Sequence, residues 1–189
     1  MKQAKISVSH LPQSEKSKGI LAETKSKMSF VPNMYLSMAG NTSLLESYIS
    51  AYNSFRSNSG FSPVEQEVVL LSVSFENSCE YCVAAHSFVG DKMTNVPTEI
   101  TNAIREGRTL PDAKLNALSQ ITKLMTANRG RITEEQLKEF FEVGYTESDL
   151  LGVITGIGVK TMSNYSNHIT QPQLDTVFAE RVWEKPSQH

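Results

Sequence analysis

The sequence lacks several features that define common classes of protein. None of its 189 residues lies in an apolar run of membrane-spanning length. The longest nearly apolar runs, 68–75 and 150–159, are far shorter than the roughly 20 residues that a helix needs to cross a bilayer. The first fifteen residues contain no apolar stretch of the kind found in signal peptides. We therefore expect a cytoplasmic protein whose thiols are kept reduced.

An excess of charge of one sign is also absent. Lys and Arg total 18 and Asp and Glu total 20, which gives a formal net charge of -2. A nucleic-acid-binding domain normally carries a basic excess, so the balance argues against that class. Hydrophobic residues make up 39% and charged residues 20% of the chain, as in folded globular proteins. We expect neither a nucleic acid nor a membrane as partner.

The sequence has no segment that alternates apolar and polar residues between turn signals, as a half-buried strand would. Every strong pattern is helical. Capping signals begin at Ser62, Thr133 and Thr146, and the helix predicted over 64–75 is apolar on nearly every face. Another helix is expected from Ser78 to Gly90, because glycine is a frequent helix terminator. The patterns predict an all-α protein.

The domain organisation follows from the same patterns. We expect one helical domain over 28–184, a loosely held polar segment over 1–27 and a flexible tail over 185–189. In the last long helix, several apolar residues are expected to face the core: Leu150, Leu151, Ile154, Ile157 and Met162. Gly156 and Gly158 in that helix indicate close helix packing rather than nucleotide binding, since a phosphate-loop pattern is absent.

Cysteine is scarce, and the two residues present, Cys79 and Cys82, are three positions apart. A disulfide across so short a loop would stabilise the fold by only about 2 kcal/mol on the entropic account. A structural staple is therefore a poor interpretation in a reducing compartment. Two cysteines at this spacing in an intracellular protein indicate redox chemistry or metal binding.

A histidine follows the cysteines at helical spacing. At 100° per residue, Cys79, Cys82 and His86 lie within about 60° of one another on one helix face. With Asn77 or Ser78 as the N-cap, Cys79 would occupy the first turn. The partial positive charge of a helix N-terminus and a neighbouring imidazole both favour the thiolate. The segment thus combines a nucleophile, a second sulfur and a base, which are the parts of a dithiol peroxidase or disulfide reductase.

The motif Cys79-x-x-Cys82-x-x-x-His86, after a helix of the form Ser-Pro-x-Glu-x-Glu-x-Val, resembles the carboxymuconolactone decarboxylase-like superfamily. Within it, the chain is most similar to the alkylhydroperoxidase D-type (AhpD-like), peroxidase-related branch. Segments 30–33 and 164–168 resemble the same branch, so the likeness extends over roughly residues 28–180. The resemblance implies a helical bundle without an organic cofactor that assembles as trimers or hexamers. A Phe- and Met-rich stretch at 28–38 would be covered in such an oligomer.

The resemblance also implies a role for each site residue. Cys82 would attack a hydroperoxide and become a sulfenic acid. Cys79 would donate a proton and then resolve the sulfenic acid to a disulfide, which an external dithiol or lipoyl-type protein reduces. His86 and Glu67, twelve positions before the first cysteine, would form a proton relay. The chain departs from the branch at Tyr81, where a histidine is frequent, and this departure bears on the rate and the peroxide specificity.

Other interpretations stay open at this point. The cysteines could be buried structural thiols, which are common in protein cores. They could instead hold zinc with His86 and a fourth ligand, either Glu67 or His168. Glu67 could be a solvated helix residue, and Glu76 could take its place in a relay. Lyase activity is disfavoured, because the name-giving decarboxylases lack the cysteine pair.

Overall fold

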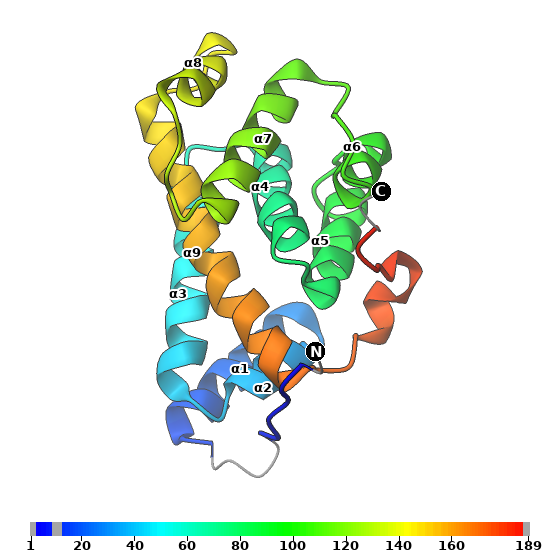
Figure 1. The fold of residues 1–189 in the computed structure, drawn as a ribbon. Coiled ribbons are helices and arrows are strands. Elements are labelled where there is room, and N and C mark those ends of the chain that lie inside the picture. The colour runs from blue at the N-terminus through cyan, green and yellow to red at the C-terminus, as the bar shows by residue number, and fades with distance from the viewer. Residues whose placement is uncertain (1–2, 9–12, 187–189) are drawn as a thin grey trace.

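The computed structural model describes residues 3–8 and 13–186, and within these ranges it contains nine α-helices, one 3₁₀ helix and no strand (Figure 1). The predicted all-α class is confirmed. The elements are α1 (Glu15–Met28), α2 (Asn33–Met38), α3 (Thr42–Asn58), α4 (Pro63–Glu76), α5 (Glu80–Lys92), α6 (Thr98–Arg105), α7 (Ala113–Ala127), α8 (Glu134–Glu142), α9 (Glu147–Thr170) and η1 (Thr176–Arg181).

Helix α4 is the central element of the bundle. It begins with a capping box between Ser62 and Glu65, and Pro63 occupies its first position. Every residue from 66 to 74 is buried, because α5, α6, α7 and α9 all pack against this helix. A helix that is apolar on all faces is expected at the centre of a fold, and the structure confirms that prediction.

Helix α9 crosses the bundle and packs on α3 and α4 (Figure 1). At Gly156 it approaches α4 so closely that a Cβ atom would lie 2.5 Å from Val69 Cγ1. Gly158, by contrast, faces open space, so only Gly156 serves the close packing that the sequence predicts. The prediction that Leu151 and Ile154 face the core is wrong: they are 65% and 51% exposed, because α9 has neighbours on one side only.

The polar N-terminal segment is more regular than its composition indicates. Ser14 caps α1 by accepting a hydrogen bond from the Ser17 amide, and Leu21 is buried where α1 packs on α3. Residues 3–8 are not helical, and the Ile6 amide donates to the Ile169 carbonyl at 2.8 Å. Few apolar residues lie in this segment, so tertiary contacts decide its structure. Most of the tail expected at 185–189 lies outside the described residues.

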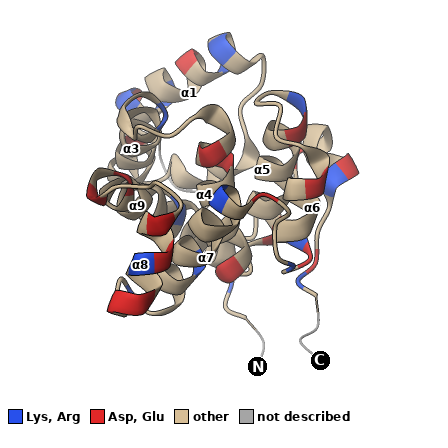
Figure 2. Cartoon of the chain, turned by 90° about the horizontal axis from the view of Figure 1, so that it is seen from above, with Lys and Arg blue, Asp and Glu red and all other residues tan. Residues whose placement is uncertain are grey.

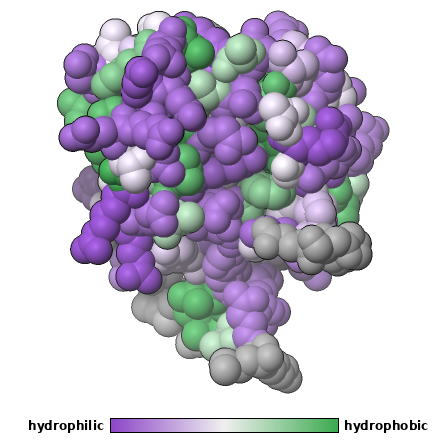
Figure 3. Space-filling view, turned by 45° about the horizontal axis from the view of Figure 1, so that its top comes forward, coloured by the Kyte–Doolittle hydropathy of each residue, from purple (hydrophilic) through white to green (hydrophobic). Residues whose placement is uncertain are grey.

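The surface carries mixed charge and no continuous apolar face in the views shown. Seen from above, acidic and basic residues are interspersed around the helices (Figure 2). A second face shows hydrophobic groups in separate patches among hydrophilic ones (Figure 3). Over residues 3–8 and 13–186, no helix has the length and hydropathy required to cross a membrane.

Candidate active site

The two cysteines lie at the junction between α4 and α5. Asn77 ends α4, Ser78 reverses the chain with a φ of 56°, and Cys79 is the N-cap of α5. The sequence-based expectation that Cys79 lies in the first turn is therefore wrong by one position. The expected end at Gly90 is also wrong, because this glycine stays helical and a Cβ there would lie 3.1 Å from Thr101 on α6.

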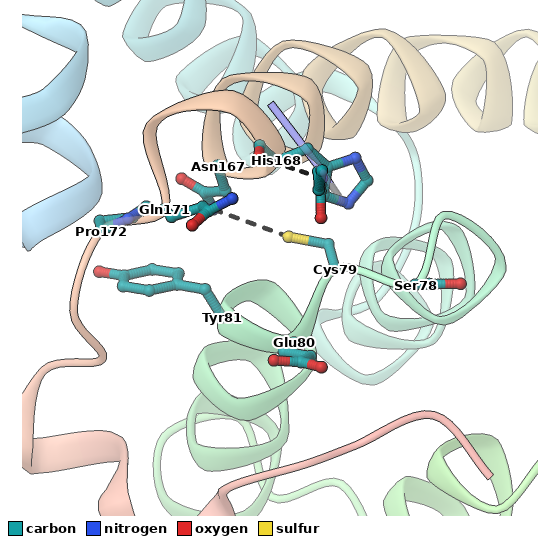
Figure 4. Close-up of a pocket in the computed structure, with 9 residues that line it drawn as sticks. Ser78, Cys79, Glu80, Tyr81, Asn167, His168, Gln171 and Pro172 are labelled. Carbon is teal, nitrogen blue, oxygen red and sulfur yellow. Dashed lines mark hydrogen bonds between the residues drawn. The ribbon is translucent and has the colours of Figure 1, made fainter. Parts of the chain in front are cut away.

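Both thiols are free, and each cysteine is only 1% exposed. Asn167 on α9 serves both of them: its Nδ2 donates to Cys82 Sγ at 3.3 Å and to Cys79 Sγ at 3.7 Å. Figure 4 shows this amide reaching from α9 to the start of α5. Two sulfurs that accept from the same amide lie close together, as a pair that forms a disulfide must. Structural thiols in a core have no such requirement.

Beyond Cys82, four polar side chains from four helices form a continuous hydrogen-bonded chain. Arg56 of α3 pairs with Glu67 Oε1 on α4. Glu67 Oε2 lies 2.8 Å from His86 Nδ1 on α5. His86 Nε2 lies 2.9 Å from Lys160 Nζ on α9. The chain therefore runs from the edge of the bundle to the region of the thiols.

The neighbours of His86 determine its tautomer. The Glu67 carboxylate only accepts hydrogen bonds, so Nδ1 carries the proton and Nε2 accepts from Lys160. Burial and the charge of Lys160 lower the pKa of His86, which favours the neutral ring. Burial opposes ionisation of Glu67, but His86 and Arg56 outweigh it and hold the pKa of this carboxyl below its usual value. The imidazole thus bridges the Glu67 carboxylate and the Lys160 side chain.

The two thiols differ in acidity. Burial by itself would raise the pKa of Cys82, but a hydrogen bond from Cys79 and the positive charge of Lys160 outweigh burial and hold this pKa well below its usual value. The hydrogen bond to Cys82, together with burial, raises the pKa of Cys79 well above its usual value. The environment of the pair therefore favours ionisation of Cys82 over ionisation of Cys79.

The structure brings Glu67 and His86 into contact and buries both, at 1% and 6% exposure. The interpretation of Glu67 as a solvated helix residue is therefore wrong. His168 takes no part in this hydrogen-bonded chain: its ring stacks on Tyr165, and its backbone carbonyl accepts a hydrogen bond from Gln3.

Three residues of the site were missed by the sequence analysis: Arg56, Lys160 and Asn167. Lys160 offered a signal, since it is the one charged residue between 150 and 163 in an otherwise uncharged stretch. A charge inside such a stretch is costly unless the fold gives it a partner. Asn167 lies in the segment 164–168 that resembles the AhpD-like branch, although that likeness gave it no role. Arg56 has no comparable signal, because only the packing of α3 brings it to Glu67.

Tyr81 does not take the place of a relay histidine. Its hydroxyl donates to the Asp175 carboxylate, which also accepts from the Asn33 amide at the start of α2 at 3.2 Å. Burial, and then the hydrogen bond to Asp175, raise the pKa of Tyr81. Figure 4 shows its ring directed toward Pro172 and away from Cys79. The hydroxyl of Tyr81 therefore joins α5 to the C-terminal segment and α2.

A pocket of about 380 Å³ opens beside the cysteines (Figure 4). Its walls are Gln3, Ser78, Cys79, Glu80, Tyr81, Asn167, His168, Gln171 and Pro172. Cys79 and Asn167 line this pocket, whereas Cys82 is not among its lining residues. A molecule that enters from solvent therefore meets the Cys79 side of the pair first.

The donors do not assemble the zinc site that the sequence left open. Both nitrogens of His86 are occupied, by Glu67 and by Lys160, so the ring does not face the sulfurs with a free lone pair. Over the part of the chain that the structure describes, no three His, Cys, Asp or Glu side chains are grouped to hold a metal ion.

No family model matches the sequence. No curated protein matches it either. Solved structures do match over nearly the whole chain. One is described as an alkylhydroperoxidase AhpD core, an uncharacterized peroxidase-related protein from Ralstonia eutropha JMP134. It is 17% identical to this chain with a TM-score of 0.81, and the alignment covers 97% of this chain and 100% of that one. An uncharacterized peroxidase-related protein from Silicibacter sp. TM1040 is 20% identical with a TM-score of 0.77, covering 94% of this chain and 96% of its own.

A third match is the debrominase Bmp8, solved as a cysteine-to-alanine variant in complex with 2,3,4-tribromopyrrole. It is 14% identical with a TM-score of 0.75, and the alignment covers 95% of this chain and 97% of that one. At identities this low, the structural matches establish the fold alone. The chain has the AhpD-like helical fold, and the resemblance stated from its sequence is confirmed at that level.

Proposed function

We propose that this protein is a dithiol oxidoreductase that reduces hydroperoxides, with Cys82 as the peroxidatic residue and Cys79 as the proton donor and resolving thiol. One observation carries the proposal: two free buried thiols share the Asn167 amide, and their pKa values are displaced in opposite directions. A structural pair of thiols has no need of that asymmetry, whereas a nucleophile with an adjacent resolving thiol depends on it.

The reaction takes place in two steps. The Cys82 thiolate attacks the terminal oxygen of the hydroperoxide; an S–O bond forms, the O–O bond breaks, and the leaving oxygen takes up a proton to become an alcohol. Cys79 then attacks the sulfur of the resulting sulfenic acid, forming a disulfide and releasing water. Two thiols are oxidised and one hydroperoxide is reduced to an alcohol and water.

The proposed proton relay consists of His86 and Glu67. Glu67 holds the imidazole in one tautomer, and the imidazole holds Lys160, so that protons move along a fixed set of hydrogen bonds. The disulfide would be reduced by an external dithiol, such as a lipoyl-type group, entering through the pocket to the sulfur of Cys79. Exchange at that sulfur releases Cys82, whose low pKa makes it the better leaving group.

Homo-oligomerisation as trimers or hexamers is part of the proposal. Four large apolar side chains on α9 are exposed between 46% and 65%: Leu151, Ile154, Tyr165 and Ile169. The 28–38 stretch contributes less than its composition indicates, since Met34, Tyr35 and Met38 are buried within their own chain. Sedimentation of the wild type against Leu151→Glu tests this part of the proposal.

The function is tested by single-turnover reaction of the reduced protein with hydrogen peroxide and cumene hydroperoxide. We expect Cys82→Ser to abolish turnover with the fold intact, and Cys79→Ser to stop at a sulfenic acid that dimedone traps. Full peroxidase activity in Cys82→Ser would refute the assignment. A brominated pyrrole is tested alongside as a second candidate acceptor of the same two electrons, because one solved structure of the same fold is a debrominase.

A further inference from the structure

We propose that Lys160 is a catalytic residue of this site, acting as the counter-ion of the Cys82 thiolate and as the acid that protonates the leaving oxygen. The second role rests on the proposed function, whereas the ion pair does not. The acid role takes the place of the proton donation that the proposed function gives to Cys79. Cys79 then stays the hydrogen-bond donor to the Cys82 thiolate and the resolving thiol.

The argument begins with the burial of Lys160. The residue is 0% exposed in the middle of α9, and its Nζ lies 2.9 Å from His86 Nε2. An isolated ammonium in such surroundings is very costly, so an anion must lie close to it or the group must lose its proton. The neutral His86 ring accepts one hydrogen bond but supplies no negative charge.

No carboxylate serves as that anion. Among residues 3–8 and 13–186, no Asp or Glu lies within ion-pair distance of Lys160. Glu67 is on the far side of the imidazole and is paired with Arg56. These two charges therefore compensate each other and leave Lys160 without a carboxylate.

Cys82 is the remaining anion beside Lys160. Its Sγ lies 3.8 Å from Ser163 Oγ, which in turn donates to the Lys160 carbonyl at 3.2 Å, so the sulfur faces this turn of α9. The positive charge of Lys160 helps to hold the pKa of Cys82 below its usual value, against the opposing effect of burial.

The other titratable groups around the thiol are neutral or already paired. Burial raises the pKa of Tyr35 on α2 and of Tyr48 and Tyr52 on α3, which keeps these phenols neutral. On α5, the thiol of Cys79 is a donor and the ring of His86 is neutral. What remains is one ammonium and one thiolate, Lys160 and Cys82.

The charge balance extends through the reaction. When the Cys82 thiolate takes the terminal oxygen, the Lys160 ammonium gives its proton to the departing alkoxide, which leaves as an alcohol. Oxidation has then removed the negative charge, and the lysine has lost its positive charge in the same step. When an external dithiol reduces the disulfide, Cys82 regains a thiol whose proton returns to Lys160. The buried site never holds an unpaired charge.

The ion pair is tested without any peroxide. In a Cys79→Ser background, Cys82 is the sole thiol, and its ionisation is followed by absorbance at 240 nm between pH 5 and 9. We expect mostly thiolate at pH 7. Adding Lys160→Met should move the titration to about pH 8.5 or above and reduce the thiolate fraction at pH 7 about tenfold or more. Lys160→Arg, which keeps the positive charge, should keep most of the wild-type thiolate fraction at pH 7.

The matched control is Lys123→Met in the same background, since Lys123 is a half-buried lysine over the Phe75 ring. It should leave the titration unchanged. An unchanged titration in a folded Lys160→Met protein would overturn the ion pair. If circular dichroism shows that Lys160→Met does not fold, Lys160→Gln is used in its place. A shifted titration without any peroxide reaction would refute the proposed function and leave the ion pair standing.

The acid role is tested at a pH above the Cys82 titration measured in both proteins, so that Cys82 is ionised in each. The remaining rate loss caused by Lys160→Met should be at least about tenfold larger for an alkyl hydroperoxide than for a peroxy acid, because a carboxylate leaves without needing a proton. An equal loss for the two oxidants would show that Lys160 is not the acid.

Discussion

Glu67 and His86 are nineteen residues apart on neighbouring helices, and a 2.8 Å hydrogen bond joins Oε2 of one to Nδ1 of the other inside the bundle. This contact connects two longer-range ones, the pairing of Glu67 with Arg56 and of His86 with Lys160. The packing of α3, α4, α5 and α9 around this chain is therefore coupled to the protonation state of the site.

The first prediction concerns the buried carboxylate. Glu67→Gln keeps the shape of the side chain but leaves the charged Arg56 without a negative partner, and we expect it to lower the free energy of unfolding by about 3 kcal/mol at pH 7. Urea unfolding measures this change. Glu139→Gln, on an exposed face of α8, is the control and should stay within about 0.5 kcal/mol of the wild type.

The same substitution changes the pH dependence of stability. The pKa of Glu67 is lower in the folded protein than its usual value of 4.5. Its stabilising contribution is therefore fully present above about pH 4.5 and is lost as the pH falls through the folded-state pKa. Glu67→Gln should flatten the acid limb of a stability–pH curve. If stability falls as steeply with acid pH in Glu67→Gln as in the wild type, the ion pair between Glu67 and Arg56 does not have this role.

The second prediction concerns the amide that serves both sulfurs. Asn167→Ala removes a donor to the Cys82 thiolate, and a hydrogen bond to a charged group is worth about 1.5–3 kcal/mol. We expect the rate of reaction with hydrogen peroxide at pH 7 to fall by about tenfold or more. Asn77→Ala removes a 3.0 Å bond to Asn164 instead, and should leave the rate within about twofold.

The third prediction separates Tyr81 from the chemistry. Tyr81→Phe loses the hydrogen bond to Asp175 and should cost about 1–3 kcal/mol of stability, since the half-buried carboxylate of Asp175 loses its hydroxyl donor. The rate of sulfenic acid formation should not change, because this hydroxyl is directed away from the cysteines. A tenfold fall in that rate, in a folded variant, would place Tyr81 in the proton relay after all.

The fourth prediction compares two glycines of one helix. Gly156→Ala brings a Cβ to 2.5 Å from Val69 Cγ1 and should destabilise the protein by about 1–3 kcal/mol through overpacking between α9 and α4. Gly158→Ala meets open space and should stabilise it by about 0.5–1 kcal/mol through helix propensity. Thermal unfolding of both variants measures the difference, and equal effects would refute the close approach at Gly156.

The sequence by itself determined the class of fold, the central position of α4 and the pairing of two cysteines with a histidine, because these depend on local spacing and on helix capping. The capping boxes at Ser62, Thr133 and Thr146 all form as their residues predict. Local spacing did not determine what His86 touches. A helical wheel places its ring beside Cys82, but the packing of α4 and α9 gives its two nitrogens to Glu67 and Lys160.

Tertiary structure alone decided which distant side chains complete the site. From α9, about eighty residues further along the chain, Asn167 reaches the thiols and Lys160 reaches His86, and Arg56 reaches Glu67 from α3. The tertiary structure also decided that the polar N-terminal segment forms the helix α1, and that Leu151 and Ile154 are exposed, since both depend on which helices lie alongside. A buried charge needs a partner, and in this protein the packing of α9 determines which group that partner is.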